Sequence, residues 1–163
     1  MTEDPQFRLA AESDADVLLT LMEEYYAFDG HGFDREQARV ALTDLLRNAS
    51  LGAAWLILDA TVPVGYIVLC HGYSLEWLGR DAFVDELYLR KDYRGRGWGR
   101  KAMVFIEDAA RERGIRTLHL GVVAGNDRAL HLYRKLGFHE HQSRFLSKWI
   151  AREASKPEGR HGY

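Results

Sequence analysis

The spacing of apolar residues predicts a strand followed by two helices at the start of the chain. Apolar and polar residues alternate over 7–11, which is typical of a short strand with one buried face. From Ser13 onward apolar residues recur at helical spacing, until the glycine-containing stretch 29–32 interrupts them. A second helix is expected over about 34–48, because its apolar residues again fall on one face.

The rest of the chain predicts further strands and helices. Two apolar runs, AAWLIL and VGYIVLCHGY, are joined through 59–63 and predict an antiparallel hairpin. The elements expected after it are a strand at about 82–89, a helix at 97–113, a strand at 115–124, a helix at 126–136 and one or two strands within 138–150. This order implies a mixed sheet flanked by helices. Residues 1–150 are expected to form a single domain, followed by a loose tail, 151–163.

Composition supports one folded domain. The chain has 163 residues, 47% of them hydrophobic, which is enough for a core without disulfide or metal staples. Its 22 Lys and Arg residues against 24 Asp and Glu residues give a net charge of −2, so there is no general electrostatic reason to bind nucleic acid. The apolar runs are too short to cross a bilayer, and the N-terminal MTEDPQF lacks signal-peptide features. We therefore expect a cytoplasmic protein with no membrane partner.

A glycine-rich turn between a strand and a helix carries the strongest local signal. Gly95, Gly97 and Gly99 let the backbone approach a ligand, and the N–H groups at the helix start suit a phosphate. The arginines that add positive charge around this turn are Arg94, Arg96 and Arg100. The spacing excludes a Walker A loop and fails the dinucleotide fingerprint. The alternative is a tight turn with a solvated basic face.

Two motifs resemble those of the GNAT N-acetyltransferase superfamily. The coenzyme A signature Gln/Arg-x-x-Gly-x-Gly/Ala is matched by Arg94, Gly97 and Gly99. The second family block, Asn-x-x-Ala-x-x-x-Tyr-x-x-x-Gly-Phe, is matched by Asn126, Ala129, Tyr133, Gly137 and Phe138. The likeness covers most of residues 6–150. It implies a GNAT fold of the α/β (α+β) class, with a mixed, mostly antiparallel sheet of about seven strands flanked by four helices.

The resemblance also implies acetyl-CoA as the cofactor and assigns residues to it. In the family, turn amides hold the pyrophosphate, and the preceding strand offers main-chain groups to the pantetheine arm. These roles fall here on Leu87, Tyr88, Leu89, Arg94, Gly95, Arg96, Gly97, Trp98, Gly99 and Arg100. By the same resemblance Asn126 contacts the pantetheine arm, and Tyr133 protonates the departing thiolate as general acid. The alternative is that Asn126 caps its helix and Tyr133 packs against the sheet.

Amine acetylation also needs a proton acceptor, because an ammonium group has no lone pair with which to attack. Asp85 matches the position where a diamine acetyltransferase-like subgroup carries its proposed glutamate base. Because Asp is shorter than Glu, a water relay and Glu86 are the alternatives. The two carboxylates point to opposite faces of a regular strand, unless a bulge intervenes. Both can instead bind the cationic amine or serve a structural role.

The acceptor side is less specific in sequence. The segment GYSLEWLGRDAF resembles the acceptor-side loop of the same subgroup, and its Glu76 and Trp77 can hold an amine by charge and cation–π attraction. Trp77 can equally fill a groove at a dimer contact. The first two helices and their connector are expected to cover the acceptor site, with Tyr25, Tyr26, Asp29 and His31 among their residues.

Two weaker signals favour structural explanations. Cys70 lies inside an apolar strand without a sign of an activating partner, so we expect a buried spectator rather than a nucleophile. His139 and His141 are expected to be surface histidines, because no third ligand accompanies them and no metal is predicted.

These observations favour an acetyl-CoA-dependent N-acetyltransferase that acts on the primary amine of a small molecule by direct attack in a ternary complex. One alternative is a non-catalytic acyl-CoA-binding regulatory module. Others are a protein or peptide N-acetyltransferase, and an RNA-binding protein that uses the basic turn. The family resemblance makes a homodimer the expected assembly.

Overall fold

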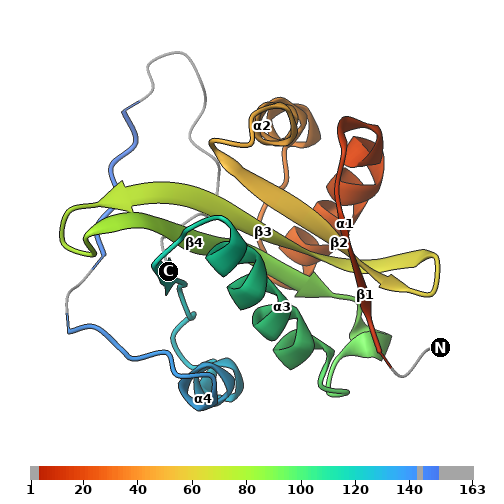
Figure 1. Ribbon diagram of the computed structural model, residues 1–163. Helices are drawn as coiled ribbons and strands as arrows, with labels where there is room; N and C mark the ends of the chain where they lie inside the picture. The colour runs from red at the N-terminus through yellow and green to blue at the C-terminus, as the bar shows by residue number, and fades with distance from the viewer. Residues whose placement is uncertain (1–3, 143–144, 151–163) are drawn as a thin grey trace.

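A five-stranded sheet runs through the part of the chain that the computed structural model describes, residues 4–142 and 145–150. The elements are, in chain order, β1 (Gln6–Leu9), α1 (Ala15–Phe28), α2 (Arg35–Arg47), β2 (Gly52–Asp59), β3 (Val62–Ser74), β4 (Gly79–Leu89), α3 (Trp98–Glu112), β5 (Thr117–His119) and α4 (Asp127–Lys135). Short 3-10 turns precede α1 and follow β4. Helices α1 and α2 cover one face of the sheet, and α3 and α4 lie on the other (Figure 1).

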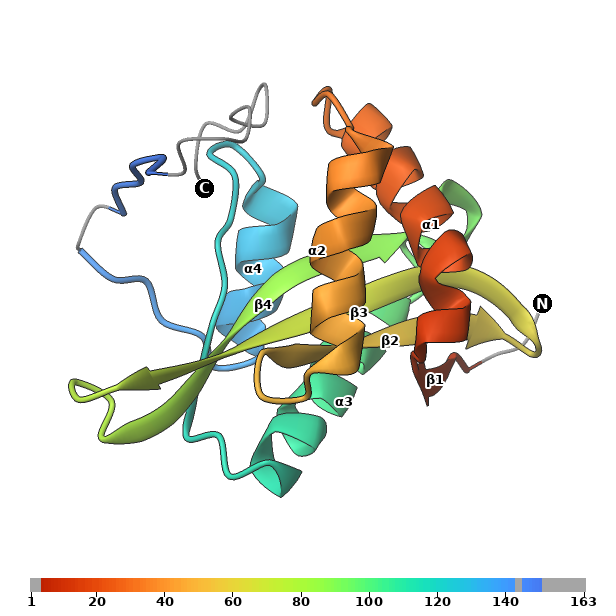
Figure 2. The same ribbon diagram turned by 90° about the horizontal axis from the view of Figure 1, so that it is seen from above.

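The strands follow one another in the order β1-β2-β3-β4-β5. The first four are antiparallel to their neighbours, whereas β5 is parallel to β4. Pairing between β4 and β5 covers only three residue pairs, from Asp81–Thr117 to Phe83–His119. Beyond them the chain that follows β5 turns away from β4, as Figure 2 shows. The sheet is therefore split at the second half of β4.

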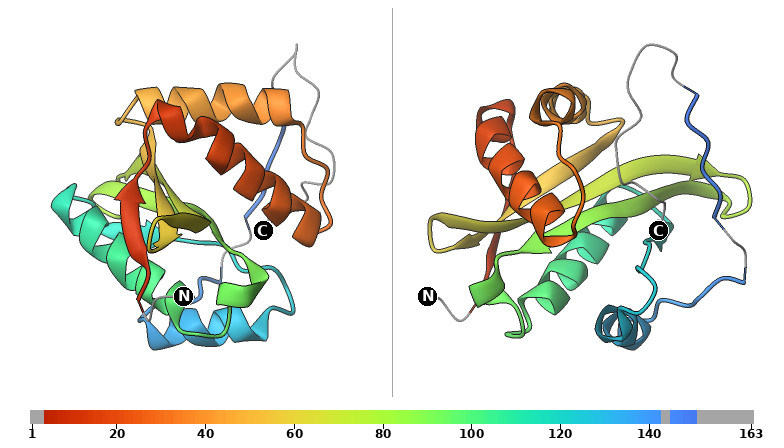
Figure 3. Two further views of the ribbon diagram at one scale, coloured as in Figure 1. Left: turned by 90° about the vertical axis from the view of Figure 1, so that its right-hand side faces the viewer. Right: turned by 180° about the vertical axis from the view of Figure 1, so that it is seen from behind.

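Two hydrophobic cores lie on opposite faces of the sheet. Alternate residues of β2 and β3 contribute to each, as strands covered on both faces require. Trp55 and Ile67 pack on the α3 side, where Trp98 is 1% exposed. Leu56 and Tyr66 pack on the opposite side, against α1 and α2. Figure 3 shows the sheet between its two layers of helices.

The expectation of about seven strands is wrong for the described residues, which form five. Strand β5 spans three residues instead of ten, and the parts of 138–150 that the structure describes contain no strand. The prediction rested on apolar side chains such as Leu146 and Ile150, but these are 89% and 82% exposed. A strand needs a neighbouring edge with which to pair, and apolar content alone does not supply one.

The remaining elements agree with the expected order, and α2 begins where predicted. Asp34 caps α2, because its Oδ1 accepts hydrogen bonds from the N–H groups of Glu36 and Gln37 at 3.1 and 3.0 Å. The predicted tail, 151–163, lies outside the described residues, as do 143–144. None of the helices in the described part combines the length and apolar character needed to cross a membrane.

Candidate active site

The glycine-rich turn leads from β4 into α3 with a left-handed backbone. Gly95 and Gly97 have φ values of 79° and 83°, a region that costs other residues roughly 1–2 kcal/mol. Gly97 is the residue before α3, so the first N–H groups of that helix face outward from the turn. A Cβ added at Gly97 or Gly99 would meet no atom within 4 Å. Open space next to helix N–H groups fits a diphosphate.

The arginines around this turn play different parts. Arg96 and Arg100 are exposed, whereas the Arg94 Nε donates to the Leu89 carbonyl at 2.6 Å. A further arginine, which the sequence analysis missed, comes from the start of α4: a Cβ added at Gly95 would lie 3.3 Å from the Arg128 guanidinium. No sequence signal points to Arg128, because only the fold brings α4 to the turn. Its charge adds to the cationic character of the turn.

The split between β4 and β5 exposes one edge of β4 beside this turn. On one edge of β4, residues 87–89 pair with β3. On the other edge they have no partner in β5, because the pairing of β4 with β5 ends at Phe83. Backbone groups along an unpaired edge can accept an extended amide-containing chain as an added strand. The Trp98 side chain, by contrast, is buried in the core, so only its backbone is available to a ligand.

Strand β4 contains a bulge at the carboxylates. Val68 pairs with Glu86 and Leu69 pairs with Val84, which leaves Asp85 as the extra residue. The bulge is the exception that the sequence analysis named, so the opposite-face rule of a regular strand does not apply to the two carboxylates. The charges of Asp85 and Glu86 both raise the pKa of the Cys70 thiol, so both act on the α1 side of the sheet.

Two buried phenols fix the Glu86 carboxylate. The Tyr26 hydroxyl donates to Oε1 at 2.6 Å, and the Tyr66 hydroxyl donates to Oε2 at 2.7 Å. Burial, followed by the charge of Glu86, raises the pKa of Tyr66 well above its ordinary value. The Tyr66 phenol thus stays a protonated donor at neutral pH. Tyr26 comes from α1, one of the two helices expected to cover the acceptor site. Tyr66 comes from β3, and the sequence analysis did not assign it to the site.

Tyr25 is close to several of the predicted site residues. Its ring packs against those of Tyr26 and Tyr88, with centroids 5.4 and 5.8 Å away. Burial raises its pKa to about 12, helped in order by Glu86, Asp29, Tyr133 and Asp85. The predicted residues Tyr25, Asp29, Asp85, Glu86 and Tyr133 therefore lie within electrostatic range of one phenol, although they come from separate parts of the chain.

Tyr133 reaches this group from α4. Its ring meets that of Phe138 edge-on at 5.8 Å, and it packs against the core on the α3 side. Burial raises its pKa, so the phenol keeps its proton at neutral pH. This packing is compatible with either a structural role or a role as proton donor.

Comparison with known sequences agrees with this architecture. The sequence profile of the Acetyltransferase (GNAT) family matches residues 16–138. The chain belongs to this family. Thialysine N-epsilon-acetyltransferase from Bos taurus is 36% identical over 74 residues, which cover 45% of this chain and 43% of that protein. L-amino acid N-acyltransferase MnaT from Escherichia coli (strain K12) is 32% identical over 98 residues, covering 52% of this chain and 56% of its own. The chain thus spans about half the length of the curated relatives it matches.

Solved structures show the same GNAT fold. An integron cassette protein from the mobile metagenome of a salt marsh superposes with a TM-score of 0.81 at 33% identity, covering 90% of this chain and 91% of that one. A protein from Clostridium acetobutylicum, described as a predicted acetyltransferase with acetyl-CoA, superposes with a TM-score of 0.75 at 16% identity. It covers 88% of this chain and 96% of its own.

Three predicted site residues, Asn126, Trp77 and Glu76, have the following surroundings. Asn126 caps α4, because its Oδ1 accepts the Ala129 N–H at 3.2 Å. Trp77 lies between the rings of His119 and His141, at 5.4 and 5.5 Å, beside a cavity of about 380 Å³ on the α3 side. Glu76 is exposed on the β3–β4 connection. The structure does not bring Glu76 or Trp77 to the Tyr25 group.

Cysteine and metal chemistry find no support in the described residues. Burial, together with Asp85 and Glu86, raises the pKa of the Cys70 thiol to about 11. A thiol with this pKa is almost entirely protonated at neutral pH and is a poor nucleophile. Across residues 4–142 and 145–150, no group of His, Cys, Asp and Glu side chains is arranged to hold a metal ion.

Proposed function

We propose that this chain is an acetyl-CoA-dependent N-acetyltransferase that acetylates the primary amine of a small molecule in a ternary complex. The observation that carries the proposal is that Tyr133, Asp85 and Glu86 all act electrostatically on Tyr25, while β4 is split from β5 in its second half. A proton donor and a proton acceptor near the same place are what acyl transfer to an amine requires.

The cofactor-binding residues fit acetyl-CoA by their geometry. The backbone of 94–100 at the start of α3 would hold the diphosphate, with Arg128 adding charge. The edge of β4 that does not pair with β5 would pair with the pantetheine amides at 87–88, since the Leu89 carbonyl already accepts from Arg94. Asn126 would contact the amides through its amide nitrogen. When bound, acetyl-CoA supplies a thioester carbonyl as electrophile.

The acceptor side would deprotonate and hold the amine. We assign proton acceptance to Asp85, directly or through one water, because it is exposed in the bulge. Glu86 already accepts a hydrogen bond at each oxygen, which suits it to attract the cationic amine rather than to take its proton. The ammonium first loses one proton through Asp85 to solvent. The neutral amine then forms the new N–C bond as the C–S bond breaks, and the second proton lost from nitrogen leaves by the same route, while solvent restores the proton that the sulfur receives.

Tyr133 would protonate the sulfur as the C–S bond breaks. Its raised pKa lies above the value of about 8.5 that is ordinary for a thiol. Complete transfer to a thiolate is therefore uphill, by at least about 2 kcal/mol. We assign Tyr133 a hydrogen bond to the developing charge, with its proton moving in the same step.

The relatives suggest which amines to test. One is named for thialysine and another for L-amino acids, and both compounds are small amines. Thialysine, a set of L-amino acids and kanamycin form a suitable panel, and an N-terminal peptide tests the protein-directed alternative. A cytoplasmic location and a homodimer remain predictions.

The test is thiol release from acetyl-CoA with each amine, for the wild-type chain and for Tyr133→Phe. We expect the substitution to lower kcat by about 10²–10⁴-fold and to leave acetyl-CoA affinity, measured by calorimetry, unchanged. Tyr73→Phe, at an exposed position on the β3–β4 hairpin, is the control and should match wild type. Unchanged turnover in Tyr133→Phe would contradict the assignment. Acetyl-CoA binding without turnover on any amine would favour a non-catalytic acyl-CoA-binding module.

A further inference from the structure

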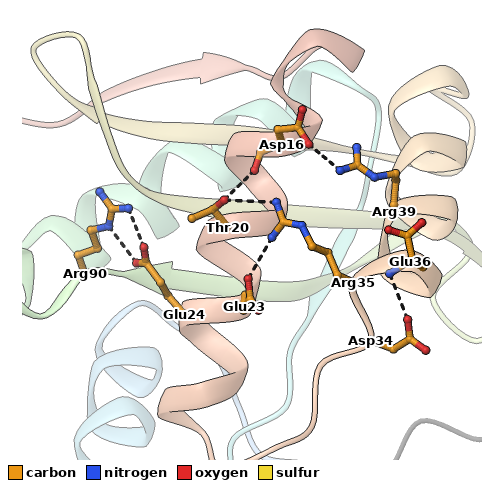
Figure 4. Close-up of polar contacts among 9 residues, drawn as sticks. All are labelled: Asp16, Thr20, Glu23, Glu24, Asp34, Arg35, Glu36, Arg39 and Arg90. Carbon is orange, nitrogen blue, oxygen red and sulfur yellow. Dashed lines mark hydrogen bonds and ion pairs between the residues drawn. The ribbon is translucent and has the colours of Figure 1, made fainter.

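An ion pair at the junction of three elements holds α1 against the sheet. Arg90, directly after β4, donates from Nε to Glu24 Oε2 at 2.9 Å and from Nη2 to Glu24 Oε1 at 2.7 Å (Figure 4). Its Nη1 donates to the Pro63 carbonyl on β3 at 3.1 Å. The Tyr88 hydroxyl also donates to Glu24 at 3.3 Å. This two-bond geometry fixes orientation as well as distance.

Glu24 is adjacent in sequence to the acceptor-side tyrosines. Tyr25 and Tyr26 follow it on the same turn of α1, and Tyr26 donates to Glu86 at 2.6 Å. A helix is stiff over one turn, so displacement of Glu24 also displaces both tyrosines. The place at which Arg90 holds α1 therefore sets where the phenols meet the carboxylates of β4.

The ion pairs that neighbouring α1 residues form lead to a different element. Glu23 pairs with Arg35 at 3.0 Å, and Asp16 pairs with Arg39 at 2.6 Å, both on α2 (Figure 4). These contacts join the two helices to each other but not to the sheet. The Glu24–Arg90 pair is thus the charged contact in the described region that ties the second half of α1 to the end of β4.

A second contact supports the same attachment one helical turn later. The Arg94 guanidinium lies over the Phe28 ring, 4.0 Å from its centroid. Glu24 and Phe28 are four residues apart and share one face of α1. Arg90 and Arg94 lie on either side of the short 3-10 turn that leads to the glycines. The segment that begins the diphosphate turn therefore also carries α1.

We infer that Glu24 and Arg90 are positioning residues of the acceptor site, which fix Tyr25 and Tyr26 over the β4 carboxylates. This inference rests on the proposed function for its kinetic consequence. The pair touches neither the amine nor the diphosphate in this assignment. Loss of the pair raises the KM of the amine and leaves the backbone-built cofactor turn intact.

The test compares Glu24→Gln with Glu23→Gln. The two substitutions are the same, lie on adjacent residues of α1 and each remove one ion pair, but only the first removes the ion pair that joins α1 to the end of β4. With whichever amine of the panel the wild-type chain acetylates fastest, we expect Glu24→Gln to raise the amine KM about tenfold. The Kd of acetyl-CoA by calorimetry should stay unchanged, and Glu23→Gln should match wild type in both.

Hydrogen exchange gives a readout that needs no turnover. Amides in the second half of α1 should exchange about tenfold faster in Glu24→Gln than in Glu23→Gln, because local opening of the helix becomes easier. A Glu24→Gln/Arg90→Gln double variant should be no worse than the stronger single variant, as expected for two partners of one contact.

The outcomes separate the inference from the proposed function. If the wild-type chain acetylates none of the amines, the exchange comparison alone decides whether the pair positions α1. Equal exchange rates in the two single variants would overturn the inference. So would equal amine KM values, or a loss of acetyl-CoA affinity as large as the rise in amine KM.

Discussion

The two sides of the proposed site are built from different materials. The cofactor side consists mainly of backbone: left-handed glycines, the N–H groups at the start of α3 and the edge of β4 that does not pair with β5. The acceptor side consists of side chains from α1, β3 and β4, held by the hydrogen bonds of Tyr26 and Tyr66 to Glu86. The first depends on local dihedral angles, whereas the second depends on how separate elements are held together.

The two sides also differ in charge. Four arginines surround the cofactor turn, namely Arg94, Arg96, Arg100 and Arg128. Carboxylates gather on the acceptor side, namely Asp29, Asp85 and Glu86. A net charge of −2 conceals this polarity, which complements an anionic diphosphate on one side and a cationic amine on the other.

The largest expected effect separates the two acceptor-side carboxylates. Asp85→Asn removes the proposed proton acceptor, so we expect kcat/KM for the amine to fall by about 10²-fold or more. Glu86→Gln removes a charge that two phenols hold in place, so it should act mainly on the amine KM. Steady-state kinetics with thiol detection measures both. Neither substitution should change the Kd of acetyl-CoA, because that side is built from backbone.

Asp85→Asn and Glu86→Gln together also decide which of the two carboxylates accepts the proton. Wild-type kcat in Asp85→Asn, together with a large loss of kcat in Glu86→Gln, would exchange the roles of the two carboxylates. A loss of acetyl-CoA affinity in either variant would contradict the separation of the two sides.

The same difference explains which half of the site the sequence predicts. Gly95 and Gly97 are recognisable because a left-handed backbone restricts the residue type, and this requirement is local. The contact of Tyr26 with Glu86 spans 60 residues and depends on where α1 crosses the sheet. Arg128 is equally hidden, because it reaches the turn only through the packing of α4.

Errors in the fold prediction have the same origin. The helices and the first four strands follow from the spacing of their apolar residues or from continuous apolar runs, which their own sequences define. The bulge at Asp85 does not, because one extra residue changes the register without changing the apolar pattern. The expected strands within 138–150 failed because strand pairing depends on an available edge rather than on apolar content.

A smaller effect, on acetyl-CoA affinity, tests the cofactor side. Gly97→Ala places a side chain at a φ of 83°, which costs about 1–2 kcal/mol. We expect acetyl-CoA affinity to fall by about 5–30-fold, since the strained turn must be restored on binding. Gly114→Ala, at a φ of 68° beyond the end of the same helix, is the control: an equal loss of thermal stability is expected, with no loss of affinity. Equal affinities in the two variants would contradict a binding role for the turn.

The smallest expected effect concerns the other end of α1. Asp14 is 9% exposed and accepts hydrogen bonds from Arg8 Nη1 and Nη2 at 2.9 and 2.8 Å. The hydrogen bonds from Arg8 are the main reason that its pKa lies below the ordinary 3.8. Because the pKa of Asp14 is lower in the folded state, its charge stabilises the fold at pH values above the ordinary pKa. This stabilisation is lost as the pH falls through the lowered pKa.

Asp14→Asn should therefore reduce the free energy of unfolding by about 1 kcal/mol at neutral pH and by progressively less below about pH 4. Urea unfolding across this range measures the difference, with Asp16→Asn as the exposed-pair control that should change little. If Asp14→Asn lowers the free energy of unfolding equally at neutral and acid pH, the charge of Asp14 does not stabilise α1. Because the cofactor side does not depend on Asp14, the affinity of Asp14→Asn for acetyl-CoA should equal that of the wild-type chain.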